Sequence, residues 1–329
     1  QSLKTGGCTI ILISHKLHEV MALSDRITVL RAGKVVGLFQ TDRVVKEELT
    51  APMMGSNKTP QFDQKGLKDL NESSILCPSE KKHPLLQLLD ITATTYQGGC
   101  GLRDIQFSLY PGEILGIAGI DGNGQRELAE IVAGVSKAAK GSINIHGKRI
   151  KNPRPKQMIK AGVAFIPQDR YVSGAIGDFS LEENLLLPVH REYPFSSFGL
   201  LRKESMSNFA KSCLEEFGIK APNVEFKAKA LSGGNLQKLV LARELSRNPS
   251  IIVACYPTRG LDLSARDYLW FKLKQEKEKG KGILLITADS DEIFTLCDRV
   301  GILYAGKLIG PMATKEITPQ ILGLYMSGG

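Results

Sequence analysis

Short runs of apolar residues recur along the second part of the chain. Residues 114–118, 163–166, 251–254 and 283–287 are four or five residues long and consist almost entirely of apolar side chains. Runs of this length without polar alternation are typical of strands buried on both faces, as in parallel sheets. We therefore predict that these four runs are neighbouring strands of one mainly parallel sheet.

Two further regions accompany the predicted sheet. Apolar segments at residues 85–89 and 105–109 predict a lobe of antiparallel strands before the first run. Residues 171–229 carry helical patterns of apolar positions and predict a helical lobe after the second run. The pattern as a whole predicts an α/β fold with two additions to its central sheet.

The chain also contains an internal repeat. Residues 7–37 align with residues 280–310 at an offset of about 273 positions, with roughly a dozen identities, including Glu19/Glu292 and Asp25/Asp298. Each copy has the pattern of a buried apolar strand, an amphipathic helix, a second strand and a tight Ala-Gly-Lys turn. The repeat predicts the tail of one domain followed by a complete second copy.

The segment between the two copies differs in composition. Residues 51–84 are polar and interrupted by several Pro and Gly residues, so they cannot bury enough apolar surface to form a domain. We predict that residues 1–50 are the tail of a first domain, 51–84 a linker and 85–329 the second domain. The repeat offset and the absence of an initiator Met before Gln1 predict a C-terminal part of a protein of about 500 residues.

A glycine-rich loop follows the first apolar run. It reads Gly119-Ile120-Asp121-Gly122-Asn123-Gly124-Gln125-Arg126 and leads into a helical pattern at residues 127–133. A strand, such a loop and a helix N-terminus bring backbone N–H groups and the positive end of the helix dipole to one point, which suits a polyphosphate. A tight structural turn has the same pattern, so the loop alone leaves both interpretations open.

This loop departs from the G-x-x-x-x-G-K-[ST] pattern at its last two positions, which are Gln125 and Arg126. The missing Lys removes a cation from the β- and γ-phosphates, and the missing hydroxyl removes a Mg²⁺ ligand. We expect catalysis to suffer more than nucleotide binding. Arg126 is a candidate to replace part of the lost charge.

Further motifs follow in a fixed order. Gln168 comes after the run 163–166, LSGGN occupies residues 231–235, and PTRGLD follows the third run at residues 257–262. In this order and spacing the chain resembles an ABC ATPase cassette, with a phosphate loop, Q-loop, signature, Walker B strand, D-loop and switch region. The resemblance implies a P-loop NTPase fold with a mainly parallel sheet core, an antiparallel β lobe and a helical subdomain.

The same resemblance identifies what this cassette lacks. The family pattern ends the Walker B strand with Asp and Glu, where this chain has Cys255 and Tyr256. A buried thiol behaves as a small apolar group, and a neutral phenol is a poor general base near pH 7. Ala288 stands at the switch position, whereas the repeat has His15 there. We expect a site built on this phosphate loop to be hydrolytically silent.

In this family two cassettes meet head to tail, and each ATP lies between one phosphate loop and the opposite signature. The resemblance therefore implies a working site that joins an upstream phosphate loop and the catalytic His15 to the signature of this cassette. Its implied cofactors are ATP and Mg²⁺, with Mg²⁺ mainly at the upstream site and no metal ligand assigned in this chain. The nucleotide-binding residues implied here are Gly119, Asp121, Gly122, Asn123, Gly124, Gln125, Arg126, Gln168, Ser232, Gly233, Gly234 and Asn235.

Composition adds little to this interpretation. With 43 basic and 34 acidic residues the net charge is +9, which permits nucleic-acid, membrane-surface or phosphorylated partners. The charges are dispersed, and the Lys- and Glu-rich residues 272–281 are interpreted as a solvated helix face. The six Cys residues form no CxxC pair. No run approaches the roughly 18–20 apolar residues of a membrane span, so membrane association is expected to run through a partner.

The cargo is inferred from resemblance alone. Fused cassettes with a weakened second half resemble the ATP-binding subunits of simple-sugar and nucleoside importers, and GIAGIDGNGQ at residues 116–125 and DFSLEENLLL at residues 178–187 favour the nucleoside branch. The resemblance implies permease subunits docked on the helical lobe, an extracellular substrate-binding lipoprotein, cassette–cassette pairing, no nucleic acid, and a peripheral position on the cytoplasmic face of the membrane. A monosaccharide importer, a soluble tandem ABC protein and an interaction module without nucleotide remain alternatives.

Overall fold

The computed structural model describes residues 7–13, 17–31, 34–44, 48–49, 83–94, 101–150 and 153–327. They form two compact units. The first contains the described residues up to 49 together with 262–267, and the second contains 83–261 and 268–327. His15 and residues 51–82 of the predicted linker lie outside the described residues.

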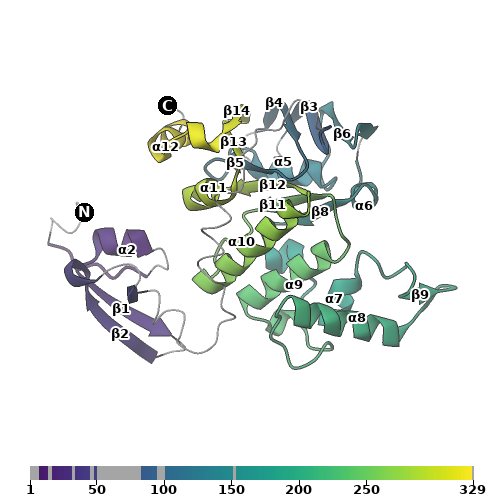
Figure 1. Cartoon of the computed structure of the whole chain (residues 1–329), viewed down its shortest axis with the longest axis horizontal. Coiled ribbons are helices and arrows are strands. Elements are labelled where there is room, and N and C mark those ends of the chain that lie inside the picture. Colours follow the sequence, from purple (N-terminus) through teal and green to yellow (C-terminus); the bar gives the residue numbers. More distant parts are fainter. Residues whose placement is uncertain are drawn as a thin grey trace. The chain divides into compact units, whose positions relative to one another are not determined.

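A six-stranded sheet forms the centre of the second unit (Figure 1). Its strand order is β14-β13-β5-β12-β11-β8, in which β14 runs antiparallel to β13 and the other neighbours are parallel. The four predicted runs are confirmed as adjacent parallel strands. The strands are β5 (Ile114–Ala118), β8 (Val163–Ile166), β11 (Ile251–Cys255), β12 (Gly282–Thr287), β13 (Arg299–Tyr304) and β14 (Lys307–Ala313).

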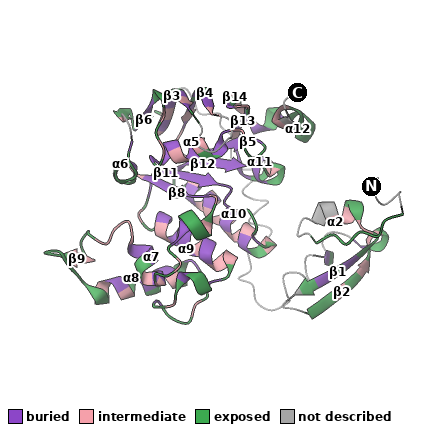
Figure 2. Cartoon of the chain, turned by 180° about the vertical axis from the view of Figure 1, so that it is seen from behind, coloured by how far each residue is buried: buried purple, intermediate pink, exposed green. Residues whose placement is uncertain are grey.

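Both faces of this sheet are buried, and alternate residues of a strand enter different hydrophobic clusters. In β5, Ile114 and Ala118 join the cluster that contains the helical lobe. Leu115 and Ile117 join a second cluster on the opposite face. Strands β11 and β12 are buried along their whole length (Figure 2). A strand covered on both faces must be apolar at every position, which explains the continuous runs in the sequence.

A four-stranded antiparallel sheet with the order β4-β3-β6-β7 covers one face of the central sheet. It confirms the antiparallel lobe predicted at residues 85–109 and extends it by two strands. Its strands are β3 (Leu86–Ala93), β4 (Leu102–Leu109), β6 (Lys140–Ile145) and β7 (Lys148–Ile150). Because β6 and β7 are only partly buried and rich in polar residues, their apolar pattern was too weak to predict them.

The opposite face of the central sheet is covered by helices (Figure 1). The helical lobe predicted at residues 171–229 is confirmed by α7 and α8, which pack with α9. This lobe also carries a small hairpin formed by β9 (Ser196–Ser197) and β10 (Leu200–Leu201). The helices after the first unit are α5 (Gln125–Val132), α6 (Pro155–Lys160), η2 (Arg170–Gly174), α7 (Leu181–Leu186), α8 (Lys203–Glu216), η3 (Ala228–Ala230), α9 (Gly233–Leu245), α10 (Leu263–Glu278), α11 (Ser290–Leu296), η4 (Thr314–Glu316) and α12 (Pro319–Ser327). Of these, α5 and α6 pack on the side of the antiparallel sheet. Within the described part of the chain, no helix is long and apolar enough to cross a bilayer.

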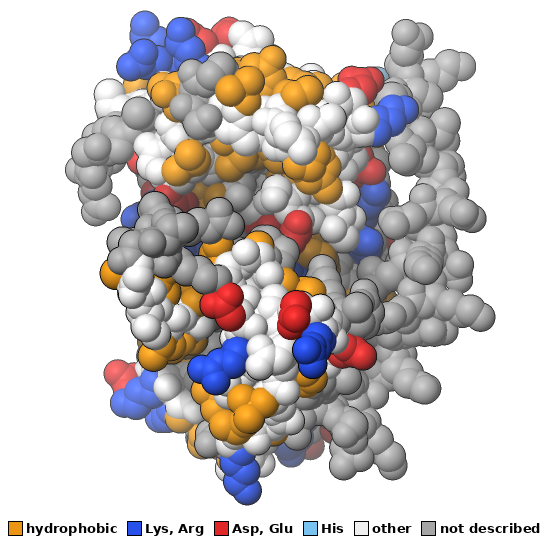
Figure 3. Space-filling model, turned by 90° about the vertical axis from the view of Figure 1, so that its left-hand side faces the viewer, with side chains coloured by type: hydrophobic (Ala, Val, Ile, Leu, Met, Phe, Trp, Pro, Cys, Tyr) orange, Lys and Arg blue, Asp and Glu red, His pale blue; other side chains and the backbone are white. Residues whose placement is uncertain are grey.

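The charged side chains on one face of the molecule are not sorted by sign. On the face that Figure 3 shows, Lys and Arg side chains lie interspersed with Asp and Glu side chains. The solvated face predicted for residues 272–281 is wrong at two positions: Glu276 and Lys281 are 4% and 8% exposed and form an ion pair. Burial of this pair is possible because each charge has its partner in contact.

The first unit reproduces the end of the second unit at the predicted offset. It consists of α2 (Leu17–Leu23), β1 (Arg26–Arg31), β2 (Lys34–Gln40) and η1 (Thr41–Arg43). Adding 273 to these bounds gives those of α11, β13, β14 and η4. The register repeats as well, since Arg26 pairs with Gln40 as Arg299 pairs with Ala313.

One predicted element of the first copy is absent. Residues 8–13 were expected to be a buried strand, but they form no regular structure, and Ile11 and Ile13 are 89% and 94% exposed. Their counterpart β12 is buried because it lies between β11 and β5. The described residues of the first unit include no parallel strands that could flank this run in the same way.

Candidate nucleotide-binding site

The glycine-rich loop joins β5 to the N-terminus of α5, as predicted. Gly122 and Gly124 have φ angles of 94° and 107°, in the left-handed region that favours glycine. A Cβ at Gly119 would collide with the Gln125 side chain and the Leu303 carbonyl oxygen. The loop therefore has the backbone shape of a phosphate-binding loop at the carboxyl end of a parallel strand.

The side chain of Gln125 folds back into this loop and is 1% exposed. Its Oε1 accepts a hydrogen bond from the Asn123 N–H at 3.0 Å, and its Nε2 donates to the Ile120 carbonyl at 2.9 Å. Loop N–H groups are the donors that hold phosphate oxygens in such loops. In this chain one of them is already satisfied by the protein's own carboxamide.

Asn123 fastens the loop to the turn between β13 and β14. Its Oδ1 accepts the Ala305 N–H at 2.9 Å, and its carbonyl accepts the Gly306 N–H at 3.1 Å. The Asn123 amide also donates to the Ile120 carbonyl at 3.0 Å. The loop is thus held in shape by internal hydrogen bonds.

Arg126 does not direct its charge at the loop. Its Nε donates to Glu130 at 2.7 Å, one turn further along α5, and its side chain is 60% exposed. Glu130 in turn accepts the Ser136 hydroxyl at 2.7 Å. This i, i+4 pair is the ordinary arrangement on a helix surface, so the Arg126 guanidinium is paired along α5 rather than directed at the loop.

The loop instead carries an acidic side chain that is paired with Arg259. Asp121 Oδ2 lies 2.7 Å from Arg259 Nη1, and both side chains are about half exposed. The Arg259 guanidinium also lies 5.9 Å from the centre of the Tyr256 ring. A carboxylate beside the loop opposes an incoming phosphate, and its pairing uses a cation that could otherwise attract one.

The end of β11 offers no carboxylate. Burial raises the pKa of the Cys255 thiol to about 12, and the Asp121 and Glu130 carboxylates add to the rise. Burial, followed by the nearby Asp121 carboxylate, raises the pKa of the Tyr256 phenol. Both groups are therefore neutral near pH 7 and suited neither to bind Mg²⁺ nor to take a proton from water.

A buried glutamate anchors the switch region, where Ala288 is exposed. Glu292 is fully buried and accepts hydrogen bonds from Thr287 Oγ1 at 2.6 Å and from Trp270 Nε1 at 3.0 Å. Burial raises the pKa of Glu292, although these hydrogen bonds and one from Thr258 oppose the rise. Sequence reasoning missed this anchor because its partners come from β12 and α10.

The signature forms a complete helix cap at the start of α9. Ser232 Oγ accepts hydrogen bonds from the Asn235 backbone N–H at 3.4 Å and from the Asn235 amide at 3.0 Å. Asn235 Oδ1 accepts the Lys220 N–H at 3.0 Å, which ties the cap to the chain after α8. Since the Ser232 oxygen accepts twice, its own proton remains available for an outside acceptor.

The positive end of α9 lies directly behind this hydroxyl. Gly233 and Gly234 are the first two residues of the 13-residue helix and are half-buried, with no side chain to cover its N–H groups. A helix N-terminus with a hydroxyl donor and free N–H groups suits an anion such as a phosphate. This end of the cassette keeps the chemistry that the phosphate loop has lost.

The predicted site residues thus fall into two groups. The loop 119–126 and Gln168, which is half-buried, follow parallel strands that end at the same edge of the sheet. Residues 232–235 lie in the helical lobe and are linked to the loop through Arg259 and Arg170, since Arg170 Nη1 donates to the Arg259 carbonyl at 2.9 Å. Sequence reasoning missed Arg170 because its partner is 89 positions away.

We expect this chain to bind ATP weakly and to show no Mg²⁺-dependent turnover. Gln125 occupies a loop N–H, and no carboxylate stands at Cys255 or Tyr256. Gln125→Lys should tighten ATP binding by at least about ten-fold, because a hydrogen bond to a charged group contributes about 1.5–3 kcal/mol.

Equilibrium titration with labelled ATP measures this effect. Gln125→Met is the control, because it fills the same space without a charge or a hydrogen bond and should tighten binding much less. Turnover by the unaltered chain at the roughly 1–100 s⁻¹ of good phosphoryl-transfer enzymes would contradict the expectation.

The same part of the chain matches known proteins. Residues 102–259 match the family model described as ABC transporter. The nucleoside import ATP-binding protein NupA of Lactococcus lactis is 34% identical over 323 residues, covering 98% of this chain and 62% of that relative. The guanosine import ATP-binding protein NupO of Bacillus subtilis is 37% identical over 325 residues, covering 98% of this chain and 61% of that relative. The chain spans less than two thirds of the length of these relatives.

Solved structures agree on the fold. A nucleotide-free ATP-binding cassette from an ABC transporter superimposes with a TM-score of 0.62 at 22% identity, covering 74% of this chain and 99% of that one. A dimeric cassette in a post-hydrolysis state with ADP and Pi superimposes with a TM-score of 0.60 at 24% identity, covering 70% of this chain and 98% of that one. Fold, motif order and family match coincide: residues 102–259 match the ABC transporter family model and have the fold of an ABC cassette.

Proposed function

We propose that this chain supplies the second, hydrolytically silent cassette of the ATP-binding subunit of a nucleoside importer. The observation that carries the proposal is the asymmetry of the cassette. Its phosphate loop is filled by Gln125, whereas Ser232 at the start of α9 keeps a free hydroxyl proton beside two glycines that leave the helix N–H groups without a covering side chain. Such a cassette contributes a signature to a site whose phosphate loop lies elsewhere.

The repeat supports a first cassette as the owner of that phosphate loop. Because the first unit matches the end of the cassette element by element at an offset of 273, it has the structure expected for the end of another copy. We propose that this copy provides the phosphate loop and His15, with ATP and Mg²⁺ bound between the two cassettes.

Two relatives are named for nucleoside or guanosine import, which favours a nucleoside as the cargo. NupA and NupO are 34% and 37% identical to this chain. A glucose import ATP-binding protein of Haloferax volcanii is 36% identical, covering 57% of that relative. A monosaccharide importer is therefore the second candidate, and both candidates imply ATP-driven import with membrane partners at the cytoplasmic face.

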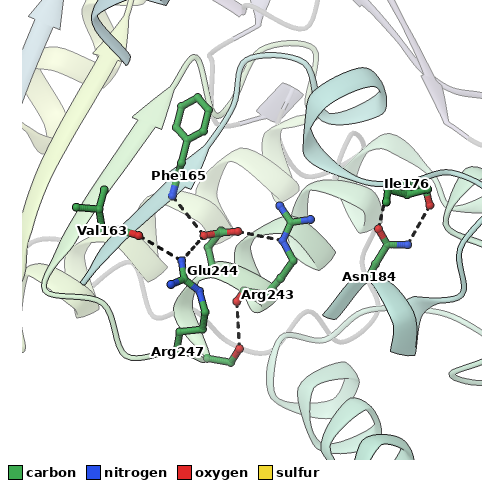
Figure 4. Close-up of polar contacts among 8 residues, drawn as sticks. Val163, Phe165, Ile176, Asn184, Arg243, Glu244 and Arg247 are labelled. Carbon is green, nitrogen blue, oxygen red and sulfur yellow. Dashed lines mark hydrogen bonds and ion pairs between the residues drawn. The ribbon is translucent and has the colours of Figure 1, made fainter. Parts of the chain in front are cut away.

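A groove beside the Q-loop is the proposed docking place of the permease. It has a volume of about 150 Å³ and is lined mainly by apolar residues of α6, β8 and the end of α5. Glu244 forms part of its wall and accepts hydrogen bonds from the Phe165 N–H at 3.3 Å, Arg243 at 3.0 Å and Arg247 at 2.6 Å (Figure 4). Asn184 Oδ1 accepts a hydrogen bond from the Ile176 N–H at 2.8 Å and so holds the segment that precedes α7. A firm wall and an apolar lining suit a partner helix with apolar side chains.

Substitution in the groove tests this partner. Ile159 lines the groove and is 36% exposed. Ile159→Glu should reduce co-purification of a multi-spanning membrane protein with the tandem protein by at least about ten-fold. The reason is that docking would bury a carboxylate without a partner. Leu89→Glu is the control, since Leu89 is 42% exposed on the antiparallel sheet, away from the groove. Equal co-purification of both variants would speak against the groove, and recovery of ribosomes or DNA instead would favour a soluble tandem protein.

A further inference from the structure

We propose that Arg170 is a positioning residue for the signature. Its guanidinium holds the first turn of α9 against the Arg259–Gly260 segment, so that the helix N-terminus meets the terminal phosphate of an ATP bound by the other cassette. This inference rests on the proposed function and adds to it the residue that sets the geometry of the signature.

The side chain of Arg170 forms a fork between two carbonyl groups. Its Nη1 donates to the Arg259 carbonyl at 2.9 Å, and its Nη2 donates to the Gly260 carbonyl at 3.3 Å. Arg170 itself begins η2, two residues after Gln168. One planar group therefore connects the segment after the Q-loop with the segment after β11, an arrangement that suits the rigid fork of an arginine.

The same guanidinium lies against the signature. A Cβ at Gly233 would be 3.3 Å from Arg170 Nη2, 3.5 Å from its Nε and 3.2 Å from the Tyr171 hydroxyl. Two of these distances, 3.2 and 3.3 Å, are tighter than ordinary van der Waals contact, so a side chain at Gly233 would press on Tyr171 and Arg170. Gly233, the first residue of α9, thus packs against the Arg170 guanidinium.

The electrostatics do not fit a purely structural role. Within the described residues, no carboxylate lies at ion-pair distance from Arg170, and apart from the two carbonyls its guanidinium faces only the Tyr171 ring, 5.5 Å away. A cation beside the positive end of a helix is unfavourable in the absence of a counter-charge. An anion bound at Ser232, Gly233 and Gly234 would supply that charge and would be attracted by the helix and the guanidinium together.

By contrast, other buried arginines of the cassette are neutralised. Arg247 is 8% exposed, pairs with Glu244 at 2.6 Å and donates to the Val163 carbonyl at 3.3 Å. It ties β8 to α9 far along the helix from the signature. Arg247 is therefore a matched control for the general effect of losing an arginine fork in this lobe.

The test is steady-state ATP hydrolysis by the full tandem protein assembled with its permease. Arg170→Ala and Arg170→Lys should each lower kcat by at least about ten-fold while KM for ATP changes less than about three-fold, because the phosphate loop that binds ATP is untouched. Lys keeps the charge but lacks the rigid planar fork whose two NH₂ groups reach the two carbonyls. Arg247→Lys should lower the unfolding temperature without this selective loss of kcat.

The outcomes separate this inference from the proposed function. If Gly234→Asp leaves turnover unchanged, the signature is not used and the proposed function fails. If Gly234→Asp abolishes turnover while Arg170→Ala retains it, only the role of Arg170 is wrong. Full activity in Arg170→Lys would overturn positioning through the two carbonyls, and a loss of kcat that merely follows the loss of folded protein, as in Arg247→Lys, would overturn a role beyond structure.

Discussion

Replacing Gly234 by Asp is expected to lower ATP turnover by the tandem protein by at least about 100-fold, although the cassette that carries Gly234 is itself silent. Gly234 is the second residue of α9, beside the capping Ser232. A carboxylate there would face the phosphate charge in a cleft from which water is excluded, where like charges repel strongly. Removing a single donor from such a site already costs about 10²–10³ in rate.

The companion variants define the division of labour. His15→Ala should be comparably severe, because His15 belongs to the proposed working site. Gln125 lies in the silent phosphate loop and Tyr256 directly follows β11. Gln125→Ala and Tyr256→Ala should therefore reduce the rate of phosphate release by only a few-fold. Loss of activity with Gln125→Ala or Tyr256→Ala, together with an active Gly234→Asp protein, would mean that the roles of the two cassettes are the reverse of those proposed.

The fold was predictable where burial is two-sided. The runs 114–118 and 251–254 have no polar residue because both of their faces are covered, so the sequence pattern and the strand positions agree almost residue by residue. Strands with one exposed face, such as β6 and β7, have a weaker pattern and were missed. Residues 8–13 show the opposite failure, because an apolar run predicts a strand only where neighbouring strands exist to pair with it.

The candidate site was predictable in its chemistry but not in its contacts. Motif order assigned Cys255 and Tyr256 to the positions at which the family pattern has its acidic residues. It did not reveal that Gln125 fills the loop, because a side chain that folds back on its own turn leaves no periodic signal. Arg170 and the buried Glu292 act through partners from other elements, and only the folded chain brings these together.

The turn after β13 carries the second large expected effect, this time on stability. Gly306→Ala should lower the free energy of unfolding by at least about 3 kcal/mol, the range of severe steric substitutions. Gly306 has a φ of 77°, and a Cβ there would overlap the Gly101 carbonyl oxygen. Its N–H bonds the Asn123 carbonyl at 3.1 Å, and its carbonyl accepts the Arg103 N–H at 2.8 Å. The backbone therefore cannot move aside without disturbing both the phosphate loop and the antiparallel lobe.

Gly280→Ala separates this clash from backbone strain. Gly280 has a similar φ of 83°, but no atom lies within 4 Å of its added Cβ, so the substitution should cost only the roughly 1–2 kcal/mol of a left-handed alanine. Urea unfolding followed by the fluorescence of Trp270, the single tryptophan of the chain, measures both variants in the same unit. An equal loss in the two variants would mean that the lobe shifts freely around residue 306, and that the turn between β13 and β14 does not fix the position of the phosphate loop.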